Sequence, residues 1–324
     1  MAASSATGRV VAISGREDAH LAFVERHLRA PLIVIDAREL VNGAELSFTL
    51  SGSRIQTSFG GQVLDPITGV WFRKPQPISE AKIPVSADFQ GYSKDAMSRH
   101  AELLLGAFEG ATWVSDYFRM LRASNKMLGS VVAKRIGFLV PDSVATSNAD
   151  VARDFISRHP TSISKSLTPA YPKIAGRQHI LFTRRIDMDH PADLTNLHLA
   201  PSIFQEAIPV AREIRAIVVA DQVFAASLES RAPATPETAR FRDNRLGNPH
   251  VEEIIDFPKE VADLCRAHCK ALGLKFGALD LIMDDHNKYW FLENNPNGQW
   301  AFVEDTTGMP IGQALARLLE QRHR

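Results

Sequence analysis

Short apolar runs alternate with segments of helical spacing along the chain, and this alternation constrains the fold more than any other feature. "GRVVAIS" (8–14) and "PLIVIDA" (31–37) are rich in β-branched residues, and "EDAHLAFVERHLR" (17–29) between them carries apolar residues at helical intervals. Such an order is typical of βαβ units, so the chain opens as an α/β domain. A hairpin over 45–59 and a strand in "GVWFRKPQP" (69–77) are predicted to extend it.

After about residue 115 the pattern changes, and two further units are predicted. A capped helix in "SNKMLGSVVAKRIGFLVPDS" (124–143) precedes strands in "SISKSL" (162–167) and "HILFTRRI" (179–186). From residue 201 strands alternate with a helix over 259–272, and the last two strands are "FGALDLIM" (276–283) and "KYWFLENN" (288–295). We predict an N-terminal βαβ domain over 1–115 and two α+β units over 116–200 and 201–324.

The charge balance argues against several classes of partner. Among 324 residues, Lys plus Arg and Asp plus Glu both total 37, so no net charge steers the chain to nucleic acid or to an anionic membrane. No run of 18 apolar residues and no signal-peptide pattern is present, so we expect a cytoplasmic protein. Cys265 and Cys269 are four residues apart on a predicted helix, and we interpret them as packing residues because zinc would need further ligands.

Two carboxylates and an amide are predicted to meet near the C-terminus. Glu293 and Asn295 are two residues apart on a strand, so their side chains point to the same face. A hairpin with His286 and Asn287 at its tip would place Asp280 directly opposite Glu293. These oxygen donors suit Mg²⁺ beside nucleotide phosphates, whereas the alternative is an ordinary solvated sheet face.

The usual phosphate-binding loops are missing from the sequence. There is no G-x-x-x-x-G-K-[ST], no G-x-G-x-x-G and no G-x-S-x-G elbow, so a phosphate site would be assembled from separate cations. The candidates are Lys126, Lys165, Arg215 and Arg242, of which Lys165 and Arg215 lie in mid-strand. Solvated strand faces are the alternative for these two. The long polar segment 233–250, which contains Arg242, is a candidate functional loop.

The motifs "VWFRKP", "SNKMLGSVVAKRIGFLVPDS", "SIFQEAIP", "FGALDLI" and "FLENNPNGQW" occur in this order. Together they resemble the ATP-grasp fold, and within it the microviridin-type peptide ligases (graspetide synthetases). The E-x-N-P ending is shared by many ATP-grasp enzymes, and the Gly-Gln-Trp after it is more characteristic of the peptide-ligase branch. The resemblance implies an α/β protein whose N-terminal βαβ domain precedes two α+β subdomains that clamp ATP.

The resemblance also implies which residues hold the nucleotide. Lys126 and Lys165 resemble the two lysines that bind the α- and β-phosphates of ATP. The backbone of Glu206, Ala207 and Ile208 resembles the hinge that hydrogen-bonds adenine.

Further roles are implied around the ribose and the transferred phosphate. Glu213 resembles the acid that binds the ribose hydroxyls. Arg215 and Arg242, as catalytic groups, and Asn244 resemble residues at the γ-phosphate and the acyl phosphate. The surrounding "ARFRDNRLG" is closer to the "FRxN" of amino-acid ligases that extend proteins with glutamate, which leaves the acceptor open.

The metal and the peptide complete the implied site. Asp280, Glu293 and Asn295 resemble the Mg²⁺ ligands. Arg73 and Lys74 are proposed to line the groove where an acidic part of the substrate or its leader docks. The alternative for these two is a pair of solvated cations at the end of an edge strand.

The activity implied is an ATP-dependent carboxylate–amine or carboxylate–hydroxyl ligase that forms an acyl phosphate and releases ADP and phosphate. We expect it to macrocyclise a ribosomally made precursor peptide through side-chain ester or amide bonds. A glutamate or amino-acid ligase of the glutathione-synthetase type and a non-catalytic ATP-binding module are the alternatives. The expected partner is a precursor peptide rather than nucleic acid or a membrane, and a homodimer is left open.

Overall fold

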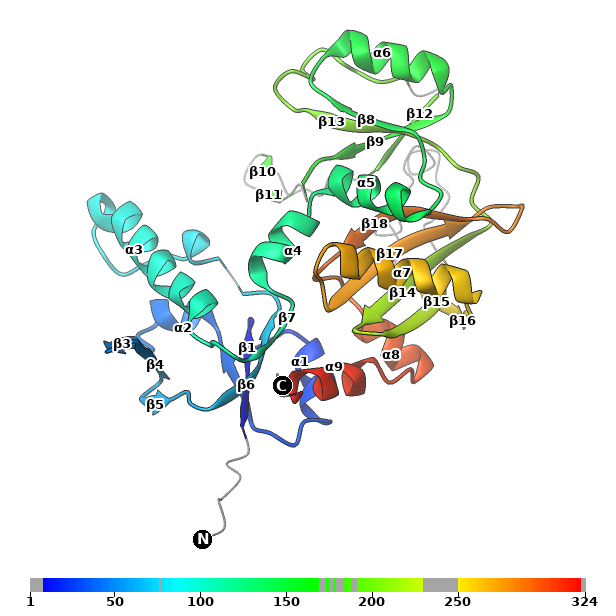
Figure 1. Cartoon of the computed structure of the whole chain (residues 1–324). Helices are drawn as coiled ribbons and strands as arrows, with labels where there is room; N and C mark the ends of the chain where they lie inside the picture. The colour runs from blue at the N-terminus through cyan, green and yellow to red at the C-terminus, as the bar shows by residue number, and fades with distance from the viewer. Residues whose placement is uncertain are drawn as a thin grey trace.

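The computed structural model describes residues 8–75, 77–168, 173–174, 177–178, 183–187, 191–229 and 250–321. Three lobes are visible in Figure 1: an N-terminal domain, a small central subdomain and a C-terminal sheet with its helices. Among the described residues, no helix combines the length and the apolar character needed to cross a membrane.

The N-terminal domain is built on a four-stranded parallel sheet in the order β2-β1-β6-β7. Its strands and the helices near them are β1 (Arg9–Ile13), α1 (His20–Glu25), β2 (Leu32–Ile35), α2 (Ala37–Val41), β6 (Ile67–Phe72) and β7 (Thr112–Val114). The predicted βαβ opening is therefore confirmed, because β1 and β2 are parallel neighbours joined through α1.

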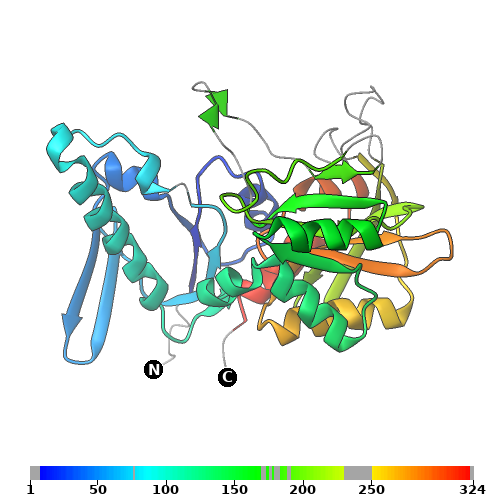
Figure 2. The ribbon, with the colours of Figure 1, turned by 90° about the horizontal axis from the view of Figure 1, so that it is seen from above.

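A separate hairpin sheet and a long helix extend this domain. They comprise β3 (Leu46–Ser51), β4 (Arg54–Phe59), β5 (Gln62–Val63), α3 (Gln90–Glu102) and the 3₁₀ helices η1 (Ile78–Glu80), η2 (Ala87–Phe89) and η3 (Leu103–Gly106). Figure 2 shows the hairpin and α3 at the end of the molecule farthest from the C-terminal sheet.

The central subdomain is a small antiparallel sheet covered by a helix. The sheet has the order β12-β9-β13-β8, and Phe155 of the covering helix α6 packs against Ile186 and Phe204. Its elements and the helices leading to it are α4 (Tyr117–Ala123), α5 (Lys126–Ile136), β8 (Ser143–Thr146), α6 (Ala149–Arg158), β9 (Ser162–Ser166), β10 (Lys173–Ile174), β11 (Arg177–Gln178), β12 (Arg184–Ile186) and β13 (Ser202–Glu206). In Figure 1 α5 lies between this sheet and the C-terminal sheet.

The C-terminal sheet is antiparallel, in the order β16-β15-β14-β17-β18. Its elements are β14 (Arg212–Val219), β15 (Gln222–Glu229), β16 (His250–Ile254), α7 (Lys259–Ala271), β17 (Phe276–Met283), β18 (Tyr289–Asn295), α8 (Ala301–Thr307) and α9 (Ile311–Leu319). One face packs on α7 through a core that contains Cys265 and Cys269, both fully buried, so the packing role predicted for the cysteines is confirmed.

The last helix, α9, joins the C-terminal sheet to the N-terminal domain. Its buried residues share one core with strands β1 and β6 and with strands β14 and β17. Gly69 on β6 permits this contact, because a Cβ there would lie 2.2 Å from the carbonyl oxygen of Leu319. The segment 201–324 is therefore not a self-contained unit, since its final helix packs against the first domain.

Candidate active site

A row of charged side chains crosses three neighbouring strands of the C-terminal sheet. Arg215 on β14 stands opposite Asp280 on β17, and Asp280 stands opposite Glu293 on β18. The Nε atom of Arg215 lies 3.1 Å from Oδ1 of Asp280. The register predicted from the hairpin count is thus confirmed at Asp280 and Glu293.

A β-bulge on β18 turns Glu293 toward this row. Leu281 pairs with Phe291 while Asp280 pairs with Glu293, so Leu292 is an extra residue on one strand. Leu281 and Phe291 both enter the core against α7. Without the extra residue, Phe291 and Glu293 would point to the same face because they are two positions apart. The bulge lets the phenylalanine fill the core and the carboxylate face the other side.

The face that carries the charged row is apolar at its other end. Ile217 and Ala278 continue the rows of Arg215 and Asp280, and both are buried in the core with α8 and α9. Helices therefore cover one half of this face, and the ionisable half lies beyond them. The side chains of Asp280 and Glu293 keep 23% and 31% of their surface exposed, so water and ligands can reach them.

Lys126 approaches the row from a helix N-terminus. Asn125 caps α5, its side chain accepting a hydrogen bond from the backbone N–H of Leu128. Lys126, the first residue of the helix, places its Nζ 3.5 Å from Oε2 of Glu293 and donates to the carbonyl of Ser166 at 3.3 Å. One lysine thereby connects α5, the end of β9 and the metal-binding strand predicted from the sequence.

Lys165 comes from the central subdomain. It lies in the middle of β9, and its Nζ donates to Oε1 of Gln205 at 2.7 Å, while Gln205 in turn donates to Ser143. Its charge is close enough to influence both Asp280 and Glu293. The structure therefore brings the lysines of two different elements to the same carboxylates, as a phosphate site built from separate cations requires.

The two carboxylates differ in their protonation behaviour. Burial raises the pKa of Asp280, and the charges of Glu293 and Glu213 add to this against the opposing charge of Arg215. Burial also acts on Glu293, but the charges of Lys126, Lys165 and Arg215 outweigh it and lower its pKa. Glu293 is thus held as an anion near neutral pH, and Asp280 is the carboxyl that takes up a proton first as the pH falls.

The donor set fits Mg²⁺ shared with a phosphate. Within the described parts of the chain, no cluster of three or more His, Cys, Asp or Glu side chains forms a complete metal cage. Mg²⁺ beside a nucleotide usually needs only one or two protein carboxylates, because phosphates and waters supply the other ligands. Asp280 and Glu293 would provide these two. Asn295 is exposed next to them, and its Oδ1 accepts a hydrogen bond from the N–H of Asn297 at 3.0 Å.

The predicted adenine hinge lies at the end of β13, where the central and C-terminal sheets meet. The N–H of Glu206 donates to Asp142, and the N–H of Ala207 donates to Thr161, so both are used within the protein. For the N–H of Ile208, no backbone acceptor is found among the described residues. The predicted adenine contact through the N–H of Ile208 therefore stays a prediction, whereas the N–H groups of Glu206 and Ala207 already have acceptors.

Glu213 lies on the same face as Arg215, two residues before it on β14, and its charge acts on Asp280. The residues Arg242 and Asn244 lie outside the described parts of the chain, and their predicted roles remain predictions.

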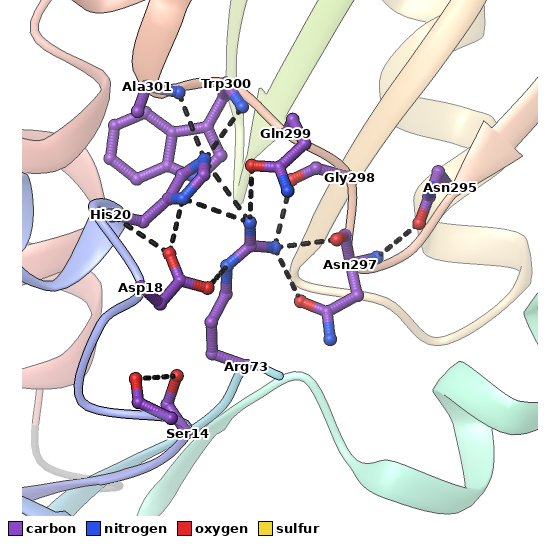
Figure 3. Close-up of polar contacts among 11 residues, drawn as sticks. Ser14, Asp18, His20, Arg73, Asn295, Asn297, Gly298, Gln299, Trp300 and Ala301 are labelled. Carbon is purple, nitrogen blue, oxygen red and sulfur yellow. Dashed lines mark hydrogen bonds and ion pairs between the residues drawn. The ribbon is translucent and has the colours of Figure 1, made fainter. Parts of the chain in front are cut away.

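For Arg73 the sequence prediction is wrong. The side chain is only 1% exposed, and β6 is an interior strand of its sheet, so Arg73 is neither a docking residue on an open groove nor a solvated cation on an edge strand. Its guanidinium is instead surrounded by Asp18, His20 and the turn that follows β18 (Figure 3). Lys74 beside it is exposed, and its predicted role in substrate binding is untested.

Sequence reasoning missed the partners of Arg73. Asp18 and His20 lie in the α1 segment, where they read as ordinary helix-start residues, and Asn297 and Gln299 read as a polar turn. Only the chain's tertiary fold brings these segments together, over a separation of more than 200 residues. The one available signal was the run "PNGQW", whose polar residues are followed by a tryptophan that the structure buries completely.

Similarity to a protein family shows the class of ATP-dependent enzyme to which this fold belongs. The chain belongs to the RimK-like ATP-grasp family, because the model of the RimK-like ATP-grasp domain matches residues 123–319. The predicted ATP-grasp fold is thereby confirmed. No curated protein matches the chain.

Solved structures extend the similarity to the whole chain. A RiPP-associated ATP-grasp ligase of Chryseobacterium gregarium, in complex with ADP and a leader and core peptide, is 23% identical with a TM-score of 0.83, over 96% of each chain. The macrocyclase MdnC of Microcystis aeruginosa MRC, bound to the precursor peptide MdnA, is 21% identical with a TM-score of 0.81, over 96% of this chain and 98% of its own. The ATP-grasp ligase PsnB, complexed with a minimal precursor, Mg and ADP, is 20% identical with a TM-score of 0.75, over 96% of each chain.

Proposed function

We propose that this chain is an ATP-dependent ligase that macrocyclises a ribosomally made precursor peptide. The observation that carries the proposal is the charged row, in which Lys126 and Arg215 lie within ion-pair distance of Glu293 and Asp280. One feature of the similarity supports a peptide as the substrate. The similarity to peptide-bound ligases includes the N-terminal domain, and it covers 96% of both chains.

The chemistry follows from the charges in the row. A substrate carboxylate attacks the γ-phosphorus of ATP, the bond to the β-phosphate oxygen breaks, and an acyl phosphate and ADP result. Lys126, Lys165 and Arg215 offset the negative charge that the transferred phosphoryl group carries. Asp280 and Glu293, with Asn295, would hold Mg²⁺, which supplies further charge neutralisation at the phosphates. The adenine would bind along residues 206–208 and the ribose at Glu213.

Bond formation needs no nucleophile from the protein. A hydroxyl or amine of the same peptide attacks the acyl carbon, loses its proton and expels phosphate. An acyl phosphate survives long enough for this only where water is kept away, which a cleft between two subdomains can do. Because the reaction consumes ATP, we place the chain in the cytoplasm.

The mass of the product tests the proposal. Purified enzyme, Mg²⁺-ATP and a precursor peptide encoded beside the enzyme should give ADP, phosphate and a peptide lighter by one water for each bond formed. An amino-acid ligase would use the same nucleotide site, but its product gains the mass of the added residue. A gain that depends on a free amino acid, or binding of ATP without any turnover, would overturn macrocyclisation in favour of one of the two alternatives.

A further inference from the structure

A buried cation of the N-terminal domain reaches the turn that follows β18, the strand that carries the proposed metal ligands. Arg73 directly follows β6, and its side chain is almost completely removed from water. Burial lowers the pKa of Arg73 to about 10, against the raising effect of Asp18, so the group remains charged at neutral pH. A buried charge is retained only where its surroundings satisfy it with opposite charge and hydrogen bonds.

One side of the guanidinium faces the first helix of the chain. Its Nε lies 3.1 Å from Oδ2 of Asp18, and Oδ1 of the same carboxylate lies 2.6 Å from Nδ1 of His20. The other ring nitrogen, Nε2, accepts the backbone N–H groups of Trp300 and Ala301 at 3.1 Å each. His20 is therefore the neutral tautomer that donates through Nδ1, and it holds the N-terminus of α8.

The other side of the guanidinium grips the turn between β18 and α8. Nη1 donates to the carbonyl of Asn297 at 2.6 Å, to its Oδ1 at 2.8 Å and to the carbonyl of Gly298 at 3.1 Å. Nη2 donates to Oε1 of Gln299 at 3.2 Å. Two of these four acceptors are backbone carbonyls, so the arginine fixes the path of the main chain through the turn.

The turn that Arg73 holds is itself hydrogen-bonded to Asn295. The N–H of Asn297 donates to Oδ1 of Asn295 at 3.0 Å, and the N–H of Gly298 donates to its carbonyl at 3.2 Å. Gly298 is packed so tightly that a Cβ would lie 2.4 Å from the Cβ of Ala278, two residues before Asp280. Arg73 is thus connected to Asn295 through a single residue, Asn297, which is hydrogen-bonded to both. Glu293 lies two positions before Asn295 on the same strand.

We infer that Arg73 is a positioning residue for the metal-binding end of β18, through which the N-terminal domain sets the geometry of the Mg²⁺ ligands. The inference rests on the proposed function, because Glu293 and Asn295 matter here as metal ligands. Partners behind metal ligands typically contribute 10- to 100-fold to metal affinity. A guanidinium suits this role because its planar fork serves several acceptors at fixed angles, which the point charge of a lysine cannot do.

The rival interpretation is that the cluster only holds the two domains together, and a neighbouring ion pair provides the control. Arg26, which directly follows α1, pairs with Glu304 of α8, so it connects the same two regions without touching the turn at 297–299. Arg26→Met therefore weakens the domain contact and leaves the turn alone.

The test measures ADP binding by isothermal titration calorimetry, with and without Mg²⁺, so that the gain in affinity from the metal is read directly. Arg73→Lys should reduce this gain by about ten-fold or more, and Asn297→Ala, which removes one acceptor from the other side, should reduce it in the same direction. ADP binding without metal should change little. Arg26→Met should keep the full gain from Mg²⁺.

Two controls keep the outcomes distinct. If Arg73→Lys does not fold, as judged by its thermal unfolding, Asn297→Ala decides. A full Mg²⁺ gain in the folded variants would overturn the inference, provided that Glu293→Gln abolishes the gain. If Glu293→Gln also keeps it, the metal assignment itself is wrong and the inference falls with it.

Discussion

Two clusters of charged residues, each built around an arginine–aspartate pair, have opposite designs. In the row of Arg215, Asp280 and Glu293, the side chains stay 13% to 31% exposed, and the ion pairs to Arg215 and Lys126 measure 3.1 and 3.5 Å. In the cluster around Arg73, the guanidinium is 1% exposed and bound to acceptors from both domains. The comparison teaches that the presence of charge does not mark a ligand site. What marks it is that the charged side chains are accessible and are not fully paired within the protein.

Protonation separates the two clusters in the same way. Although burial opposes it, the hydrogen bond from His20 and the charge of Arg73 lower the pKa of Asp18, so this carboxylate has its full complement of partners. Asp280 has a raised pKa because burial and nearby carboxylates outweigh Arg215. An additional cation would therefore stabilise the ionised form of Asp280, whereas the ionised form of Asp18 is already stabilised by its partners.

The largest expected effect is on catalysis, from a change in the row. Glu293→Gln replaces a carboxylate by a neutral amide of nearly the same shape, and ATP turnover should fall by about a hundred-fold or more while the fold is kept. Glu253→Gln is the matched control, because Glu253 is an ion-paired residue of the same sheet, bound to Arg212 and placed on β16, two strands away from Arg215. Steady-state ADP release measures both variants, and wild-type turnover in Glu293→Gln would remove this residue from the site.

Exchanging arginine for methionine in each cluster should separate stability from activity. Arg73→Met leaves Asp18 buried without its cation, and removal of one partner from a buried ion pair typically costs about 3–5 kcal/mol. Arg215→Met should cost much less, because Asp280 is more exposed and can take up a proton, yet it should lose most of the activity. Urea unfolding and ADP release test both variants. Equal losses of stability would erase the distinction between the clusters.

A smaller effect is expected from acid on the buried cluster. Burial and the charge of Arg73 lower the pKa of His20, against the hydrogen bond to Asp18. Because unfolded histidine titrates at about pH 6.5, the stability from neutral His20 is complete above that value and is lost as the pH falls through the lower folded pKa. His20→Gln should therefore lose less unfolding free energy between pH 7.5 and 5.5 than the parent does. Buried His268 has a lowered pKa as well, so part of the dependence of stability on pH remains in both the parent and the variant.

Much of the site could be predicted from the sequence because it depends on local rules. Strand alternation puts Glu293 and Asn295 on one face, and a short turn brings Asp280 opposite Glu293, as the structure confirms. Counting residues from the turn did not predict the bulge at Leu292, because the length of a hairpin does not show where one strand carries an extra, unpaired residue. The ATP-grasp fold itself was predicted through motifs, and the family match confirms it.

What the sequence could not provide is long-range burial. "VWFRKP" reads as a strand followed by exposed cations, and nothing local indicates that a turn more than 220 residues away closes over Arg73. The close contact of α9 with β6 at Gly69 is equally non-local. Both features join the first domain to the last segment of the chain, so they require the complete tertiary fold.

The most direct test of the central claim is a crystal structure of the protein with Mg²⁺ and a non-hydrolysable ATP analogue. The account predicts metal density bound by Asp280 and Glu293 at about 2.0–2.1 Å, with the phosphates against Lys126 and Lys165. The cluster around Arg73 should keep the contacts that it has here. Nucleotide and metal bound away from the row, or a rearranged Arg73 cluster that contacts the nucleotide, would contradict the account.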